Sequence, residues 1–136
     1  MTYQFSRRSI HLVCRLHQKE AGGPRGPIPY MGELELVNLS PAILEIPYQM
    51  SPLQYLELKV TGPKGEMVSE GRYSDRFSPQ AEEQVLRLVP GESFRSEVPL
   101  LSTVPRDKRK PGNYHVQAIY GWNGLQTASN VVTVAV

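Results

Sequence analysis

The fold is decided by residues 113–136, which read NYHVQAIYGWNGLQTASNVVTVAV. In the first part of this stretch apolar and polar residues alternate, which is the period expected of a β-strand with one buried face. Asn123-Gly124 then supplies a two-residue turn, because both residues tolerate the positive φ angles that a tight hairpin needs. A second run carries valine at positions 132, 134 and 136. The sequence therefore predicts an antiparallel hairpin here, with one face of each strand in a core.

Similar short apolar runs recur along the rest of the chain, without a convincing amphipathic helix. They lie at residues 10–17, 32–38, 43–46, 56–60, 85–89 and 94–100. The 12 prolines and 11 glycines fall mostly between the runs, as in proteins built from many short strands joined by turns. The length of 136 residues fits one domain. We predict an all-β antiparallel sandwich of seven to eight strands, and a helix over Gln80–Leu88 is the one competing interpretation.

The chain divides into two parts within this single domain. Residues 1–31 hold an N-terminal strand and a linker, Ala21–Pro29, that is too rich in glycine and proline for a regular element. Residues 32–136 hold the sandwich. We expect the first strand to be attached by edge pairing, so that it completes a sheet of this chain or of a partner.

One local motif narrows the type of sandwich. In Pro111-Gly112-Asn113-Tyr114 a glycine stands two residues before a tyrosine at the entry to a strand. This motif resembles the tyrosine corner of immunoglobulin-like domains, in which the tyrosine hydroxyl bonds to backbone upstream. Val116 stands where antibody domains carry a disulfide cysteine. The resemblance is therefore to an immunoglobulin-like sandwich that has no disulfide.

The order of motifs is also similar to that of bacterial immunoglobulin-like domains, notably the intracellular proteinase inhibitor family. The resemblance covers residues 32–136. Besides the Pro-Gly-x-Tyr strand entry, the matching residues are Leu34, Leu36 and Asn38 of a first strand and the turn Pro90-Gly91-Glu92-Ser93. The resemblance implies an immunoglobulin-like fold and, as one function, inhibition of a proteinase. No residue of this chain matches an inhibitory contact of that family.

Charge and cysteine content narrow the class of partner. The net charge is +2, and the one dense basic cluster, Arg106 to Lys110, lies between two prolines, which favours a solvated loop over a nucleic-acid patch. Cys14 is the only cysteine, so the fold depends on no disulfide.

No run approaches the roughly 20 apolar residues of a membrane span, and the run after Arg7-Arg8 is too short and too polar for a signal peptide. We expect a cytoplasmic protein that binds neither nucleic acid nor membranes.

Groups with catalytic or metal-binding chemistry come close in sequence at His11, Cys14 and His17. In a strand the two histidines stand about 20 Å apart on one face, at roughly 3.3 Å per residue, and Cys14 points to the other face. A zinc ion needs ligands about 2.0–2.3 Å away, so these three side chains cannot share one ion. The sequence contains no nucleophile elbow and no calcium loop. We predict no catalytic residue, no metal site and no cofactor.

The candidate binding residues are aromatic and arginine residues in predicted loops: Arg72, Tyr73, Arg76, Phe77 and Trp122. The first four lie in a long segment without periodicity, and such loops are often functional. Aromatic and arginine side chains are enriched at the centres of protein interfaces. Trp122 is expected at the tip of the last hairpin. The alternative for the aromatic residues is that each loop folds them back onto the sandwich.

These features favour a non-enzymatic protein–protein interaction module that presents loops or an unpaired strand edge. Its partner is another protein, and the chain itself is expected to be a monomer or a homodimer that exchanges its N-terminal strand. A proteinase inhibitor is the alternative, with Arg72–Ser78 or Thr103–Lys110 as the loop offered to the proteinase. Carbohydrate binding through Tyr120 and Trp122 is a third hypothesis.

Overall fold

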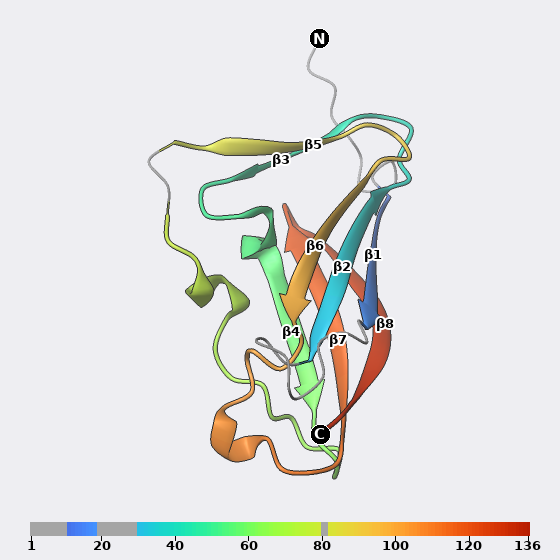
Figure 1. Ribbon diagram of the computed structural model, residues 1–136. Coiled ribbons are helices and arrows are strands. Elements are labelled where there is room, and N and C mark those ends of the chain that lie inside the picture. The colour runs from blue at the N-terminus through green and yellow to red at the C-terminus, as the bar shows by residue number, and fades with distance from the viewer. Residues whose placement is uncertain (1–10, 19–29, 80–81) are drawn as a thin grey trace.

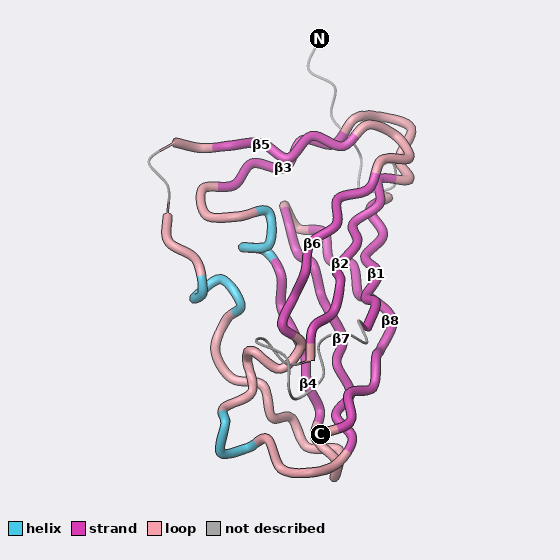
Figure 2. The backbone as a smooth tube through the Cα atoms, in the orientation of Figure 1, coloured by secondary structure: helices cyan, strands magenta, loops and turns pink. Residues whose placement is uncertain are grey.

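The computed structural model of the protein describes residues 11–18, 30–79 and 82–136. Within these ranges the strands are β1 (Leu12–Gln18), β2 (Met31–Asn38), β3 (Leu44–Tyr48), β4 (Leu56–Thr61), β5 (Gln84–Leu88), β6 (Ser93–Pro99), β7 (Asn113–Trp122) and β8 (Leu125–Ala135). Single turns of 3-10 helix are η2 (Pro52–Tyr55), η3 (Tyr73–Arg76) and η4 (Arg106–Lys108), and they are the helical segments in Figure 2. The prediction of an all-β sandwich is confirmed, with eight strands. Within the segment suggested as a helix, Gln84–Leu88 forms β5 instead, residues 82–83 belong to no regular element, and residues 80–81 lie outside the described ranges.

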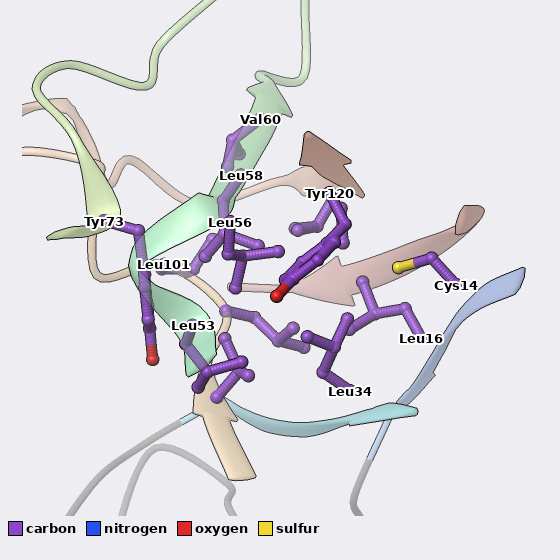
Figure 3. Packing of buried hydrophobic residues seen from close by; sticks show 14 of the residues in the cluster. Cys14, Leu16, Leu34, Leu53, Leu56, Leu58, Val60, Tyr73, Leu101 and Tyr120 are labelled. Atoms are coloured by element: carbon purple, nitrogen blue, oxygen red, sulfur yellow. The ribbon is translucent and has the colours of Figure 1, made fainter. Parts of the chain in front are cut away.

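The strands form two three-stranded sheets and one two-stranded ribbon (Figure 1). The sheets have the strand orders β1-β2-β6 and β4-β7-β8, and the ribbon pairs β3 with β5. These orders correspond to the A-B-E and C-F-G strands of an immunoglobulin-like sandwich. Apolar side chains from both sheets form one buried cluster, part of which Figure 3 shows. The predicted core face of β7 is fully buried and consists of Tyr114, Val116, Ala118 and Tyr120.

The tyrosine corner fixes the entry to β7. The Tyr114 hydroxyl lies 2.9 Å from the carbonyl oxygen of Lys108 and 2.7 Å from that of Lys110. Gly112 has a φ of 142°, and a Cβ at this position would lie 2.4 Å from Cγ of Pro63. Only glycine fits this backbone and this contact. The motif therefore anchors the loop before β7 against the sheet, as the sequence predicted.

The β3–β5 ribbon continues the β2–β6 ladder beyond a bend. Asn38 is buried at this bend, where its Nδ2 donates to the carbonyl oxygens of Ala42 (2.9 Å) and Leu88 (2.8 Å). Its Oδ1 accepts from the N–H of Ser40 at 2.9 Å. These bonds hold the turn between β2 and β3 and tie it to β5. The ribbon consequently lies across the upper end of the sandwich in Figure 1, and Ile46 on its inner face joins the main core.

Candidate protein-binding groove

The edges of the two sheets meet where β1 lies beside β8. Among the described strands β1 pairs only with β2, and β8 pairs only with β7, so each keeps one edge without a ladder. Leu16 lies beside Asn130, whereas Leu12 lines the same groove as residues 125–128. Residue numbers therefore rise in the same direction on both strands. We call this parallel junction of β1 and β8 the seam; it is on the right of the sandwich in Figure 1.

A β-bulge closes the lower half of the seam. Ala118 of β7 faces both Ser129 and Asn130, because the ladder shifts register there. A bulge redirects the side chain of its extra residue. Here Oδ1 of Asn130 accepts from the N–H of Leu16 at 2.9 Å, and Nδ2 donates to the Leu16 carbonyl oxygen at 2.8 Å. One side chain thus gives β1 the two hydrogen bonds that a neighbouring strand would provide.

The upper half of the seam is open and forms a groove of about 420 Å³. It is lined by His11–Val13 on the β1 side, by residues 125–128 of β8, and by Tyr120 and Trp122 of β7. None of these lining residues is Asp, Glu, Lys or Arg. The groove therefore contains no carboxylate, ammonium or guanidinium group, and its lining combines aliphatic and aromatic side chains with the polar groups of His11, Gln126 and Thr127.

Backbone hydrogen-bonding groups of β1 point into this groove. The N–H and carbonyl groups of Leu16 both point toward β8, as their bonds to Asn130 show. Strand residues two positions apart direct these groups to the same side, so those of Cys14 and Leu12 also face β8. His11 confirms the alternation, because its N–H and carbonyl groups bond to Ser40 and Leu39 on the β2 side. The open half of the seam therefore offers main-chain donors and acceptors to an added strand.

A cluster of charges on the outer face holds β1 to β2. The Glu35 residue is only 5% exposed, and its carboxylate accepts from Arg95 Nη2 at 2.9 Å. His17 Nε2 and Arg15 Nη1 of β1 lie 3.5 and 3.7 Å from the same carboxylate. Burial acts to raise the pKa of Glu35, but the hydrogen bonds from His17 and Arg95 and the charges of Arg95 and Arg15 lower it below its ordinary value. Ionised Glu35 therefore attracts two side chains of β1 and fixes that strand in place.

Two ionisable groups beside the groove are kept neutral by burial. Burial raises the pKa of the Cys14 thiol to about 12, so the thiolate that reacts with electrophiles is scarce near neutral pH. Burial, with smaller effects of Tyr55 and Cys14, also raises the pKa of Tyr120, whose hydroxyl donates to the carbonyl oxygen of Pro52 at 2.8 Å. Neither group is available as a nucleophile or a base in the folded chain.

Of the predicted binding residues, Trp122 lies at the groove. It is half-buried, packs against the core cluster and forms the last ladder pair of the hairpin with Leu125. The predicted Asn-Gly turn follows it, with φ angles of 53° at Asn123 and 77° at Gly124. The tight turn is what brings Trp122 and β8 together at one end of the seam.

The predicted residues of the long loop lie in a different place. Tyr73 is only 3% exposed, joins the core cluster and meets Phe77 edge-on with ring centroids 5.6 Å apart, and Figure 3 shows it among the buried side chains. Arg72 and Tyr73 line a second hollow of about 430 Å³, whose lining also includes Gly121 of β7. Tyr73 therefore follows the alternative prediction, in which the loop packs its aromatic side chain onto the sandwich. The side chain of Arg76 lies outside the described part of the structure.

Some of the cations in the basic cluster Arg106 to Lys110 make contacts within the domain. Arg109 donates from Nη2 and Nε to the carbonyl oxygens of Leu101 (2.8 Å) and Val104 (2.9 Å). Lys108 pairs with Glu70 at 2.8 Å, and this hydrogen bond raises the pKa of the Lys108 ammonium group. Two of the four cations in the cluster thus hold the loop rather than stand free. The described residues contain no group of three or more His, Cys, Asp or Glu side chains placed to hold a metal ion, and none of their helices is long and apolar enough to cross a membrane.

Comparison with known proteins finds similarity to solved structures but no match to a sequence family. No protein-family model and no curated protein matches this sequence. Among solved structures the chain is similar to the crystal structure of a beta-D-glucoside glucohydrolase from Trichoderma reesei, with a TM-score of 0.43 and 13% sequence identity. The match covers 98% of this chain and 19% of that chain, so this chain spans about a fifth of the length of the enzyme. A match at this level carries no argument about activity.

Proposed function

We propose that this domain is a non-enzymatic protein-interaction module that binds an extended segment of another protein in the open half of the seam. The supporting observation is the groove between two strand edges, which Leu12 lines and toward which strand alternation directs the main-chain groups of Leu12. Strand addition to such an edge obtains affinity from main-chain hydrogen bonds and specificity from alternate side chains. The bound segment lies along β1 as an added strand.

The lining of the groove indicates the chemistry of the segment. Trp122 supplies aromatic surface above the buried ring of Tyr120, and tryptophan is a frequent anchor of binding energy. Because the lining contains no Asp, Glu, Lys or Arg, a charged side chain would lose hydration there without gaining an ion pair with any of these residues. The fitting partner is therefore an uncharged segment with apolar residues at every second position.

The test is a selection of peptides from a displayed random library on the immobilised domain. Selected peptides are then titrated against Trp122→Ala, against Leu12→Pro, which removes the N–H facing the groove, and against Leu12→Ala, which keeps it. Proline is tolerated at the first residue of a strand, so Leu12→Pro tests the donor with little damage to β1. Trp122→Ala and Leu12→Pro should each weaken binding at least about tenfold.

The matched control is Val131→Ser, on the exposed face of β8 away from the groove. It should bind the peptides like the unchanged protein. Peptides that bind Trp122→Ala and Leu12→Pro without loss contradict the proposal, as does a selection that yields no peptide with a Kd below about 1 mM. The proteinase-inhibitor hypothesis stays a prediction from the sequence, and a titration against several serine proteinases tests it separately.

A further inference from the structure

The β3–β5 ribbon presents a second surface that the groove does not use. Leu44, Ile46 and Leu88 point into the molecule and are buried, so the residues between them point outward. The resulting outer face bears Glu45 beside Arg87 and Pro47 beside Val85. Ile43 and Val89 directly adjoin the Leu44–Leu88 pair in sequence, so the same alternation places them at the other end of this face. We call this set the ribbon face.

The ribbon face is apolar at both ends and charged in the middle. Val85 is 51% exposed, and Val89 and Ile43 are 39% and 36% exposed. Glu45 and Arg87 are more than half exposed, and the closest atoms of their ion pair are 3.9 Å apart. This loose pair leaves most of the carboxylate and guanidinium hydrogen-bonding positions open to other groups.

From this arrangement we infer that the ribbon face binds the ribbon face of a second copy of the chain. A two-fold axis that runs along the ribbon, between the facing copies, places β3 of one copy over β5 of the other at the same height. Glu45 of each copy then meets Arg87 of the second copy, so both charges are paired across the contact. The same axis places Ile43 against Val89, and Pro47 against Val85. The surface is thus complementary to itself, as a two-fold contact requires.

The other two-fold arrangement is excluded by charge. An axis across the ribbon would place Glu45 over Glu45 and Arg87 over Arg87, and like charges that face each other are unfavourable. Sheets that pack face to face keep their strands within about 30° of each other, which the axis along the ribbon permits. The charges therefore select one orientation of the second copy.

The length of the ribbon indicates a weak dimer. Five residues per strand span about 17 Å, so the contact is smaller than the roughly 800 Å² per partner of a typical stable interface. We expect the Kd to lie between about 10 μM and 1 mM. This dimer goes beyond the proposed function, because its residues are not those of the groove.

The test is sedimentation equilibrium of two charge variants, alone and mixed. Glu45→Arg makes the face wholly positive and Arg87→Glu makes it wholly negative, so each variant alone should remain monomeric at about 1 mM. In an equimolar mixture every charge again meets its opposite, and a heterodimer as tight as the unchanged dimer should form. A purely structural role of the ion pair within one copy cannot produce this recovery.

The double variant E45R/R87E restores both pairs and should dimerise by itself, which controls for damage to the ribbon. Val131→Arg, at a site that is 56% exposed on β8, should leave the dimer unchanged. The inference is overturned by an unchanged protein that is monomeric at about 1 mM, by single variants that still dimerise, or by a mixture that does not. Exchange of the N-terminal strand between copies would give a dimer in both single variants.

Discussion

The two halves of the seam between β1 and β8 differ in how the free edge of β1 is hydrogen-bonded. In the lower half Asn130 supplies both hydrogen bonds of Leu16, and Leu16 is buried beneath it. In the upper half no hydrogen bond from a described side chain to the main chain of Leu12 is present, and the groove lies at this position. The difference arises from one bulge in β8. An edge strand can therefore be held firmly at one end and remain available for pairing at the other.

The largest expected effect is the contrast between the apolar residues of the two halves. Leu16→Ala should lower the free energy of unfolding by about 2–5 kcal/mol, because it empties a buried site. Leu12→Ala should cost about 1 kcal/mol, because Leu12 is already partly exposed at the groove. Urea unfolding of both variants measures the contrast. Equal losses would show that the open half is packed as tightly as the closed half.

Removal of the side chain that closes the lower half tests the difference between the two halves of the seam. Asn130→Ala deprives Leu16 of both partners and should cost about 1–3 kcal/mol in the free energy of unfolding. Gln126→Ala, on the open half of β8, is the matched control and should stay within about 0.5 kcal/mol. If Asn130→Ala costs no more than this control, the closed half is not held by its hydrogen bonds.

The thiol of Cys14 reports opening of the seam directly. Because the thiol is buried and its pKa is raised to about 12, labelling by a thiol reagent at pH 8 should be slow and should proceed through opened molecules. Asn130→Ala should speed this labelling about tenfold, since about 1.4 kcal/mol of lost stability raises the opened fraction tenfold. Gln126→Ala should label at the rate of the unchanged protein. A fast reaction in the unchanged protein would contradict a closed lower half.

The smallest expected effect is a dependence of β1 attachment on pH. The pKa of Glu35 is lower in the folded chain than its ordinary value of 4.5, so ionised Glu35 stabilises the fold above that pH. This contribution is lost as the pH falls from about 4.5 through the lower folded pKa. Glu35→Gln should therefore give a flatter curve of stability against acid pH, measured by urea unfolding at several pH values. A curve as steep as that of the unchanged protein would assign the acid sensitivity to other carboxylates.

The hairpin and the tyrosine corner could be predicted because they depend on neighbours in sequence. The turn at Asn123-Gly124 requires only two residues that accept positive φ, and the Tyr114 hydroxyl bonds to carbonyl oxygens four and six residues away. The strand alternation similarly placed the core residues of β7. Such short-range signals determine most of the architecture.

The seam could not be predicted, because its residues come together only in the folded chain. Leu16 and Asn130 are 114 positions apart, and nothing near Asn130 in the sequence marks a bulge. Glu35 falls on the outer face by alternation, and its contacts with Arg15, His17 and Arg95 exist only in the folded chain. Trp122 was identified by its type and its place in the hairpin. The sequence predicted that the N-terminal strand pairs at a sheet edge. It did not predict that this edge lies beside Trp122 and forms one wall of a groove.

The parallel course of β1 and β8 also determines how the domain responds to mechanical tension. A pull on the start of β1 and the end of β8 acts along both strands in opposite directions, so it loads the seam in shear. The β1–β2 ladder has hydrogen bonds perpendicular to its strands and therefore shares this load over its whole length instead of opening one bond at a time. The resistance to forced unfolding is set by the rate of unfolding. The two hydrogen bonds of Asn130 raise the barrier to unfolding if they break before the β1–β2 ladder. Single-molecule stretching of the unchanged protein and of Asn130→Ala would measure how much of the resistance this one side chain provides.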